Sequence, residues 1–228
     1  MDQYHERRDG KAFLLLSAVV LLISAGLLVY SQTMAFVWDE GFHLLAAQLI
    51  NAGKTLYIDF CFAQTPLNTL WNAAWMRVFG DSWRVTHVAA ALLVSGSVFL
   101  ISDFALARFA VPRWRLPCAI VVAAFTGLNT AVVEFGPVGQ SYGMGLFLTV
   151  AAFRATILTV SRKGVFWAFA AGLLAGAAAD STLLTAPAVP VLLIWMLVYN
   201  TTGTRWPKSV AFLGAVIISF APAIWLFL

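Results

Sequence analysis

The sequence predicts an all-α fold: a polytopic transmembrane helix bundle. Of the 228 residues, 61% are apolar and only 11% are charged, and the mean hydropathy is +0.87. Soluble domains carry charges on roughly a quarter of their residues, so a soluble class is excluded. The net charge of +4 comes from cations that lie between the apolar runs. That placement indicates membrane topology and gives no support for nucleic-acid binding.

The apolar runs predict about seven spans, each near the length that a bilayer crossing needs. The first run, 12–30, is too long for a cleaved signal peptide and is expected to be a retained anchor. The remaining spans are expected at 85–107, 117–133, 141–160, 165–179, 184–199 and from 209 to the end. The fifth and sixth spans should form a hairpin that turns at Asp180-Ser181-Thr182.

The positions of the cations predict the orientation, because Lys and Arg favour cytoplasmic connectors. With the N-terminus in the cytoplasm, the segment 31–84 becomes the first extracytoplasmic loop. That loop side carries only Lys54, Arg77 and Arg84 as cations. The cytoplasmic connectors carry the others: Arg7, Arg8, Lys11, Arg108, Arg113, Arg115, Arg162, Lys163, Arg205 and Lys208.

Two charges fall inside predicted spans. Asp103 and Arg154 are expected to pair between the second and fourth spans, which we favour over a role in transport. Gly172 and Gly176 should let helices approach closely. The last span ends at Leu228 without a polar flank, so we expect residues 1–228 to be one module at the N-terminus of a longer chain.

The loop 31–84 is the one long polar segment between the spans, and it holds Asp39, Glu40, Asp59 and Asp81, four of the ten acidic residues. An amphipathic helix is expected at about 42–52, ended by Gly53 and lying in the membrane interface. Its polar positions, namely His43, Gln48 and Asn51, lie on one side.

A second interfacial helix is expected after Thr65, which would be its N-cap, with Pro66 at the first helical position. Trp71 and Trp75 then lie one turn apart and suit an anchor at the level of the lipid headgroups. The loop therefore has two surface helices, and Asp39 stands before the first.

Asp39 has two interpretations. It is either an N-cap whose carboxylate binds backbone N–H groups, or a general base at the membrane boundary that takes a proton from an acceptor hydroxyl or amine. His43 lies one turn later and could orient Asp39. A divalent metal held by Asp39, Glu40 and His43 is a further alternative, although one i,i+4 pair is a weak metal motif.

Four pieces follow one another in and just after this loop: Asp39-Glu40-Gly-Phe-His-Leu, Tyr57-x-Asp59-Phe60, Gln64-Thr-Pro66-Leu67 and Phe79-Gly80-Asp81-Ser82. In order and spacing they resemble the GT-C glycosyltransferases that use polyprenyl-phosphate sugars. More narrowly, they resemble the family of the protein O-mannosyltransferases, the aminoarabinose transferase of lipid A and the Rgt-type bacterial transferases. The resemblance covers nearly all of the chain but under half of a typical member.

The resemblance implies a catalytic site in the loop 31–84. Asp39 would be the catalytic base, and Glu40 would contact the acceptor or a metal. Residues expected at the substrate are His43, Tyr57, Asp59, Gln64, Arg84 and His87. The sequence departs from the family at Gln64, where many members have a lysine thought to meet the donor phosphate, and at His87, which replaces an arginine. Arg84 or Arg77 is the substitute cation.

The sequence therefore predicts an enzyme of the bacterial inner membrane. It would move a sugar with inversion from a polyprenyl-phosphate donor to a glycan, lipid or protein acceptor outside the cytoplasm. Its partners would be that donor, the acceptor and membrane lipids, and the present chain could be inactive without further segments. A transporter or lipid flippase is the alternative, but such proteins usually show repeated halves, and the second half of this chain does not repeat the first.

Overall fold

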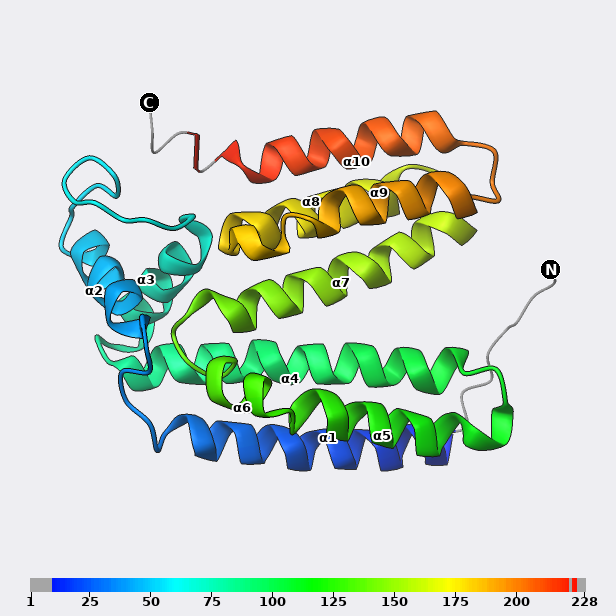
Figure 1. Cartoon of the computed structure of the whole chain (residues 1–228), viewed down its shortest axis with the longest axis horizontal. Coiled ribbons are helices and arrows are strands. Elements are labelled where there is room, and N and C mark those ends of the chain that lie inside the picture. The colour runs from blue at the N-terminus through cyan, green and yellow to red at the C-terminus, as the bar shows by residue number, and fades with distance from the viewer. Residues whose placement is uncertain (1–9, 222, 225–228) are drawn as a thin grey trace.

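Long helices dominate the computed structural model, which describes residues 10–221 and 223–224 and has no β-strand among them (Figure 1). Helices α1 (Gly10–Ser31), α4 (Trp83–Arg108) and α7 (Ser141–Ser161) are each long and apolar enough to cross a bilayer. The all-α class is thus confirmed, and these three helices are compatible with an integral membrane protein.

The other helices are shorter. They are α2 (Glu40–Asn51), α3 (Leu67–Phe79), α5 (Arg115–Gly127), α6 (Thr130–Phe135), α8 (Phe166–Ser181), α9 (Ala188–Tyr199) and α10 (Arg205–Ser219), with single 3₁₀ turns η1 (Pro112–Trp114) and η2 (Leu183–Thr185). Figure 1 shows α2 and α3 grouped at one end of the long helices, which we call the loop end. The opposite end, the basic end, carries Lys11, Arg108, Arg113, Arg115, Arg162, Lys163, Arg205 and Lys208.

Two apolar clusters hold the bundle together. The first joins α1, α4 and α5 through Leu16, Val20, Ile23, Leu27, Val94, Val98, Leu106, Ala119 and Ala123. The second joins α7 to α10 and is rich in alanine: Ala152, Ala155, Ala168, Ala171, Ala175, Leu192, Met196 and Phe212. Small residues let backbones approach closely, which is how helices associate where lipid supplies no hydrophobic drive.

Gly172 and Gly176 of α8 confirm the expected close approach. A Cβ at Gly172 would land on the carbonyl oxygen of Phe212, and one at Gly176 on the hydroxyl of Ser219, both in α10. The helix pair therefore has no room for a side chain at either position.

The two predicted intramembrane charges pair as expected. Arg154 Nη2 of α7 donates to Asp103 Oδ2 of α4 at 2.8 Å. The guanidinium also lies 5.2 Å from the ring centre of Phe104. The pair joins the two clusters across the α4–α7 contact.

The third predicted span, 117–133, is wrong as a continuous helix. It divides into α5 and α6, and Asn129 Oδ1 accepts a bond from Ala131 N at 3.0 Å to begin α6. A local side-chain bond of this kind offers the backbone an alternative to the helix. The expected turn at Asp180-Ser181-Thr182 begins two residues later than predicted, since α8 continues to Ser181.

Candidate functional site

Asp39 is exposed, at the N-cap position of α2. Its carboxylate makes no capping bond, and no hydrogen bond or ion pair of that side chain occurs within residues 10–221 and 223–224. The interpretation of Asp39 as a side-chain cap is therefore wrong. The carboxylate is left open to a ligand.

The turn that presents Asp39 is strained. Phe36 and Trp38 have φ values of 57° and 50°, in the left-handed region that non-glycine residues avoid. Such residues cost on the order of 1–3 kcal/mol each and persist only where their surroundings hold them. Here Val37 N donates to Glu40 Oε2 at 3.1 Å, and Gln140 Nε2 donates to Val37 O at 2.6 Å.

Glu40 is 0% exposed, in contrast to its neighbour Asp39. Besides Val37 N, its carboxylate accepts bonds from Gly139 N at 2.7 Å and from His87 Nε2. Burial would raise the pKa of Glu40, but the bond and charge of His87 and the two amides outweigh it and hold the pKa below 4.5. Glu40 is an interior anchor for the turn, with all its contacts inside the protein.

His87, also 0% exposed, connects this anchor to the long helices. Its Nδ1 lies 2.5 Å from the carbonyl oxygen of Ser31, the last residue of α1. Both ring nitrogens therefore face acceptor oxygens, and a protonated imidazole can donate to both. Trp83 packs against the ring edge with centroids 4.8 Å apart.

The backbone of Gly139, between α6 and α7, connects the two helices of the loop end. Its N–H donates to Glu40, and its carbonyl accepts from Asn68 Nδ2 at 3.1 Å and Asn72 Nδ2 at 2.6 Å. A Cβ at this position would lie 2.9 Å from Leu44 Cδ2 and 3.0 Å from Glu40 Oε1. Glycine is thus required by the close approach of α2.

His43 is 2% exposed and faces α3. Its Nδ1 lies 3.4 Å from Asn68 Nδ2, and its ring meets the Phe62 ring edge-on. Burial lowers the pKa of His43, although the charges of Asp39 and Glu40 act in the opposite direction. Among the described residues, no three His, Cys, Asp or Glu side chains gather as a metal site.

Tyr57 and Asp59, predicted to contact the substrate, make hydrogen bonds to backbone atoms of their own connector, 55–64. The Tyr57 hydroxyl donates to Gln64 O at 2.5 Å, and Asp59 Oδ2 accepts from Thr55 N at 2.6 Å. Burial, aided by the charge of Asp180, raises the pKa of Tyr57 to about 12. Tyr57, like Phe36 and Trp38, has a positive φ, at 69°. The structure therefore gives Tyr57 and Asp59 a folding role, and the Gln64 side chain is exposed.

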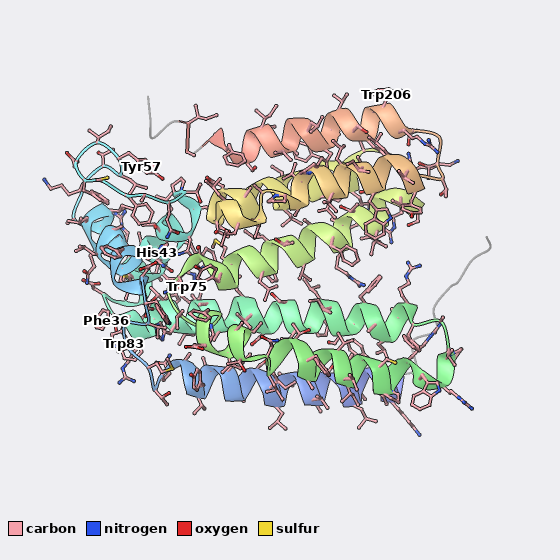
Figure 2. All side chains as sticks on the ribbon, viewed as in Figure 1. Phe36, His43, Tyr57, Trp75, Trp83 and Trp206 are labelled. Carbon is pink, nitrogen blue, oxygen red and sulfur yellow. The ribbon has the colours of Figure 1, made fainter. Side chains whose placement is uncertain are left out.

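Arg84 is an exposed cation at the start of α4. Its guanidinium lies 4.8 Å from the centre of the Trp83 ring, beside His87. Figure 2 shows Phe36, His43, Tyr57, Trp75 and Trp83 all at the loop end, whereas Trp206 lies at the basic end. The candidate site thus combines an open carboxylate and a cation at the same end of the molecule.

An apolar pocket of about 380 Å³ adjoins this turn. Its lining residues are Ala131, Val132, Phe135, Gly136, Tyr142 and Leu146. The ring of Trp38, next to Asp39, contacts that of Phe135 at a centroid distance of 6.2 Å. The strained turn therefore borders a hydrophobic hollow.

Helix α3 differs from the prediction at its start. Pro66 is its N-cap, while the Thr65 hydroxyl is buried and caps nothing. The expected aromatic row forms, with centroids 5.7 Å apart for Trp71–Trp75 and 4.9 Å for Trp75–Phe79.

Sequence reasoning missed Gly139 and Gln140, which hold the turn from the connector between α6 and α7. In the sequence, both lie in the gap between the predicted spans 117–133 and 141–160. The one-turn spacing of Asn68 and Asn72 was visible, but their shared acceptor, 71 and 67 positions away, was not. Comparison with known protein families, with curated proteins and with solved structures found no match for this chain.

Proposed function

We propose that this chain is a membrane glycosyltransferase that takes a sugar from a polyprenyl-phosphate donor, with Asp39 as general base. One observation carries the proposal: an exposed carboxylate without internal hydrogen bonds, on a strained turn anchored by a fully buried neighbour. Strained backbone clusters at functional sites, because folding alone has no use for its cost. Glu40 and His87 are then positioning residues.

The apolar pocket beside Trp38 supports a lipid-linked donor. A prenyl chain against Phe135 and Tyr142 would bring its phosphate head toward the turn where Asp39 stands. Arg84 is an exposed cation at this end, and it could neutralise the phosphate in place of the family's usual lysine.

In the proposed reaction, Asp39 removes the proton of an acceptor hydroxyl. The acceptor oxygen then attacks the anomeric carbon from the face opposite the phosphate. The bond between that carbon and the phosphate oxygen breaks, and the electron pair leaves with the polyprenyl phosphate. The configuration at the anomeric carbon is inverted. Phosphate is already a good leaving group, so positioning and base catalysis are the protein's main contributions.

The proposal includes the finer membrane arrangement: about seven spans, with the loop end outside the cytoplasm and the basic end inside. The outward residues of α2 and α3 support an interfacial position, since Phe42 is 70% exposed, Val78 72% and Phe79 63%. The inner membrane of a bacterium is the proposed location.

The test compares Asp39→Asn with the wild type in membranes supplied with radiolabelled polyprenyl-phosphate hexoses and pentoses. We expect transfer to fall by about 100-fold or more, the scale of losing a general base. Thermal unfolding in detergent should be unchanged because Asp39 makes no internal bond.

Asp81→Asn is the matched control, since Asp81 is an exposed carboxylate of the same loop that accepts one hydrogen bond, from Gln48, among the residues that the structure describes. It should retain full activity. If Asp39→Asn kept full activity, Asp39 would not be the general base. Uptake of a solute by vesicles, without any sugar transfer by the wild type, would favour the transporter alternative.

A further inference from the structure

Asp180 is a buried acid at the loop end that the proposed transfer reaction does not use. It is the next-to-last residue of α8, beyond the predicted span 165–179, and its side chain is 0% exposed. Neither of its carboxylate oxygens has a hydrogen-bond partner within residues 10–221 and 223–224. A buried carboxylate without donors is strongly unfavourable when it is ionised, so the fold favours the protonated form of Asp180.

The donors that follow Asp180 in the chain are already engaged. The Ser181 hydroxyl donates to Ala178 O at 2.7 Å, and Thr182 N donates to the same oxygen at 3.1 Å. Asp180 therefore gains no local hydrogen bond that would stabilise its negative charge.

The titratable and charged groups of the segments around α8 do not compensate the burial of Asp180. They are Arg77 in α3, Tyr142 and Arg154 in α7, Tyr199 in α9, Arg205 and Lys208 in α10, and Tyr57, Asp59 and Cys61 in the connector 55–64. The groups of α9 and α10 lie at the basic end, and Arg154 is paired with Asp103. All of the others except Tyr57 are exposed. Burial alone therefore raises the pKa of Asp180 from 3.8 to about 7.

Close packing fixes two sides of this end of α8. A Cβ at Gly145 of α7 would lie 2.8 Å from Thr182 Cγ2 and 3.4 Å from Ser181 Oγ. A Cβ at Gly176, one turn before Asp180, would land on the hydroxyl of Ser219 in α10. These two contacts have no room for a methyl group, so they also have none for water.

The third side is formed by α3 and the connector 55–64. Helix α3 packs against α8, and Figure 1 shows it beside the loop end of that helix. In the connector, Tyr57 lies near enough for the charge of Asp180 to act on it. The Tyr57 hydroxyl bonds to Gln64 O within the connector, and the Ile58 side chain is 69% exposed. Because that bond is internal to the connector, the connector can separate from α8 without breaking it.

We propose that Asp180 is a pH-dependent switch for the contact between α8 and the loop end. With its proton bound, Asp180 stays buried, and α3 and the connector 55–64 pack on α8. When the proton passes to water, the carboxylate requires solvation, and the connector and the start of α3 separate from α8 to admit water. Acid therefore closes the loop end. This switch requires no glycosyl transfer.

The pH range of the switch follows from the two environments of Asp180. In the open form the carboxyl is solvated and has its ordinary pKa of 3.8, whereas the closed form keeps the proton up to about pH 7. Opening therefore releases a proton between these two values, and the open fraction rises tenfold for each pH unit. The closed form is most favoured below pH 3.8, and this advantage is lost as the pH rises to about 7.

The test is hydrogen exchange of the full chain in detergent, followed by mass spectrometry between about pH 5 and pH 8. Protection factors correct for the pH dependence of the exchange chemistry itself. In the connector 55–64 and the first turn of α3, they should fall by about 100-fold from pH 5 to pH 7 and stay constant above that. Amides in the middle of α10 should not follow this fall.

Asp180→Asn has the same shape but no titratable proton. Its protection factors should be constant over this range and should exceed those of the wild type at pH 7. Asp81→Asn is the control, because Asp81 is an exposed acid of the same end, and it should keep the wild-type profile. Burial lowers the pKa of His43, which acts in the opposite direction, but His43 is present in all three proteins and cancels in the comparison.

Equal protection of the wild-type connector at pH 5 and pH 7 would overturn the proposal, as would the same fall in Asp180→Asn as in the wild type. An equal fall throughout α10 would also overturn it, because the whole bundle would then unfold. If Asp180→Asn fails to fold, Asp180→Leu takes its place, since leucine is of similar volume and also has no titratable proton.

Discussion

The carboxylate of Glu40 accepts a hydrogen bond from the imidazole of His87, 47 positions later in the chain, where neither side chain reaches solvent. The pair fixes the start of α2 against the end of α1 and the first turn of α4. Two adjacent acids thereby take different roles. Glu40 is buried and makes its hydrogen bonds inside the protein, whereas the Asp39 side chain lies on the protein surface.

Glu40→Gln should destabilise the fold by about 3 kcal/mol, the scale of breaking a buried charged pair. Gln has one acceptor oxygen, whereas Glu40 accepts from Val37 N on one oxygen and from Gly139 N on the other. The new NH₂ group would then face an N–H donor. Reversible unfolding by SDS from detergent micelles measures the change. Glu134→Gln, a half-buried carboxylate of the same end, should stay within about 0.5 kcal/mol of the wild type.

The Glu40 contribution should also depend on pH. Because the folded state holds the pKa of Glu40 below 4.5, the unfolded chain takes up the proton first as the pH falls. The contribution is therefore complete above pH 4.5 and is lost as the pH falls below it, toward the folded pKa. The stability gap between wild type and Glu40→Gln should narrow in acid. A constant gap from neutral pH to about pH 3 would contradict the assignment.

Gly172→Ala should destabilise the α8–α10 contact by about 2 kcal/mol, because its Cβ meets the backbone of Phe212 and one helix must move. Gly214→Ala in α10 is the matched control, since a Cβ there has no neighbour within 4 Å. That substitution should be neutral or stabilising by up to about 1 kcal/mol, through helix propensity. SDS unfolding of both variants gives the comparison. Equal stability of the two would show that the helices are not in tight contact.

Lys208→Met should cost about 3 kcal/mol, because several buried acceptors lose their donor. Lys208 is 0% exposed, and its ammonium donates to Thr159 O at 2.6 Å, Arg162 O at 2.7 Å and Thr202 Oγ1 at 2.7 Å. Lys163→Met, at an exposed lysine of the same end, should change stability by less than about 0.5 kcal/mol. Thermal unfolding in detergent compares the two variants. Similar melting temperatures would show that the hydrogen bonds of Lys208 do not stabilise the fold.

The long helices could be predicted from the sequence almost to the residue. The run 12–30 became α1 and 141–160 became α7, because a long uniform apolar segment has no competing local structure. The run 117–133 did not stay whole, because one amide side chain, Asn129, can begin a new helix inside an apolar context.

The candidate site was predictable only in part. The position of Asp39 followed from the end of the first apolar run. The different fate of Glu40 did not, because it depends on His87 and on Gly139, which is 99 positions away. Such tertiary partners leave no trace in local periodicity. Lys208 was likewise expected as a simple cytoplasmic cation, and its acceptors come from the end of α7, 49 and 46 positions earlier, and from the connector before α10.

The single residue Gly139 bonds to α2 through its N–H and to α3 through its carbonyl, which belong to two successive peptide groups. A change in the backbone conformation on both sides of that one residue would release both surface helices at once. Amide hydrogens of α2 and α3 would then exchange with solvent through a shared opening, as one cooperative unit. A segment or partner that binds the loop end would therefore slow the exchange of both helices together.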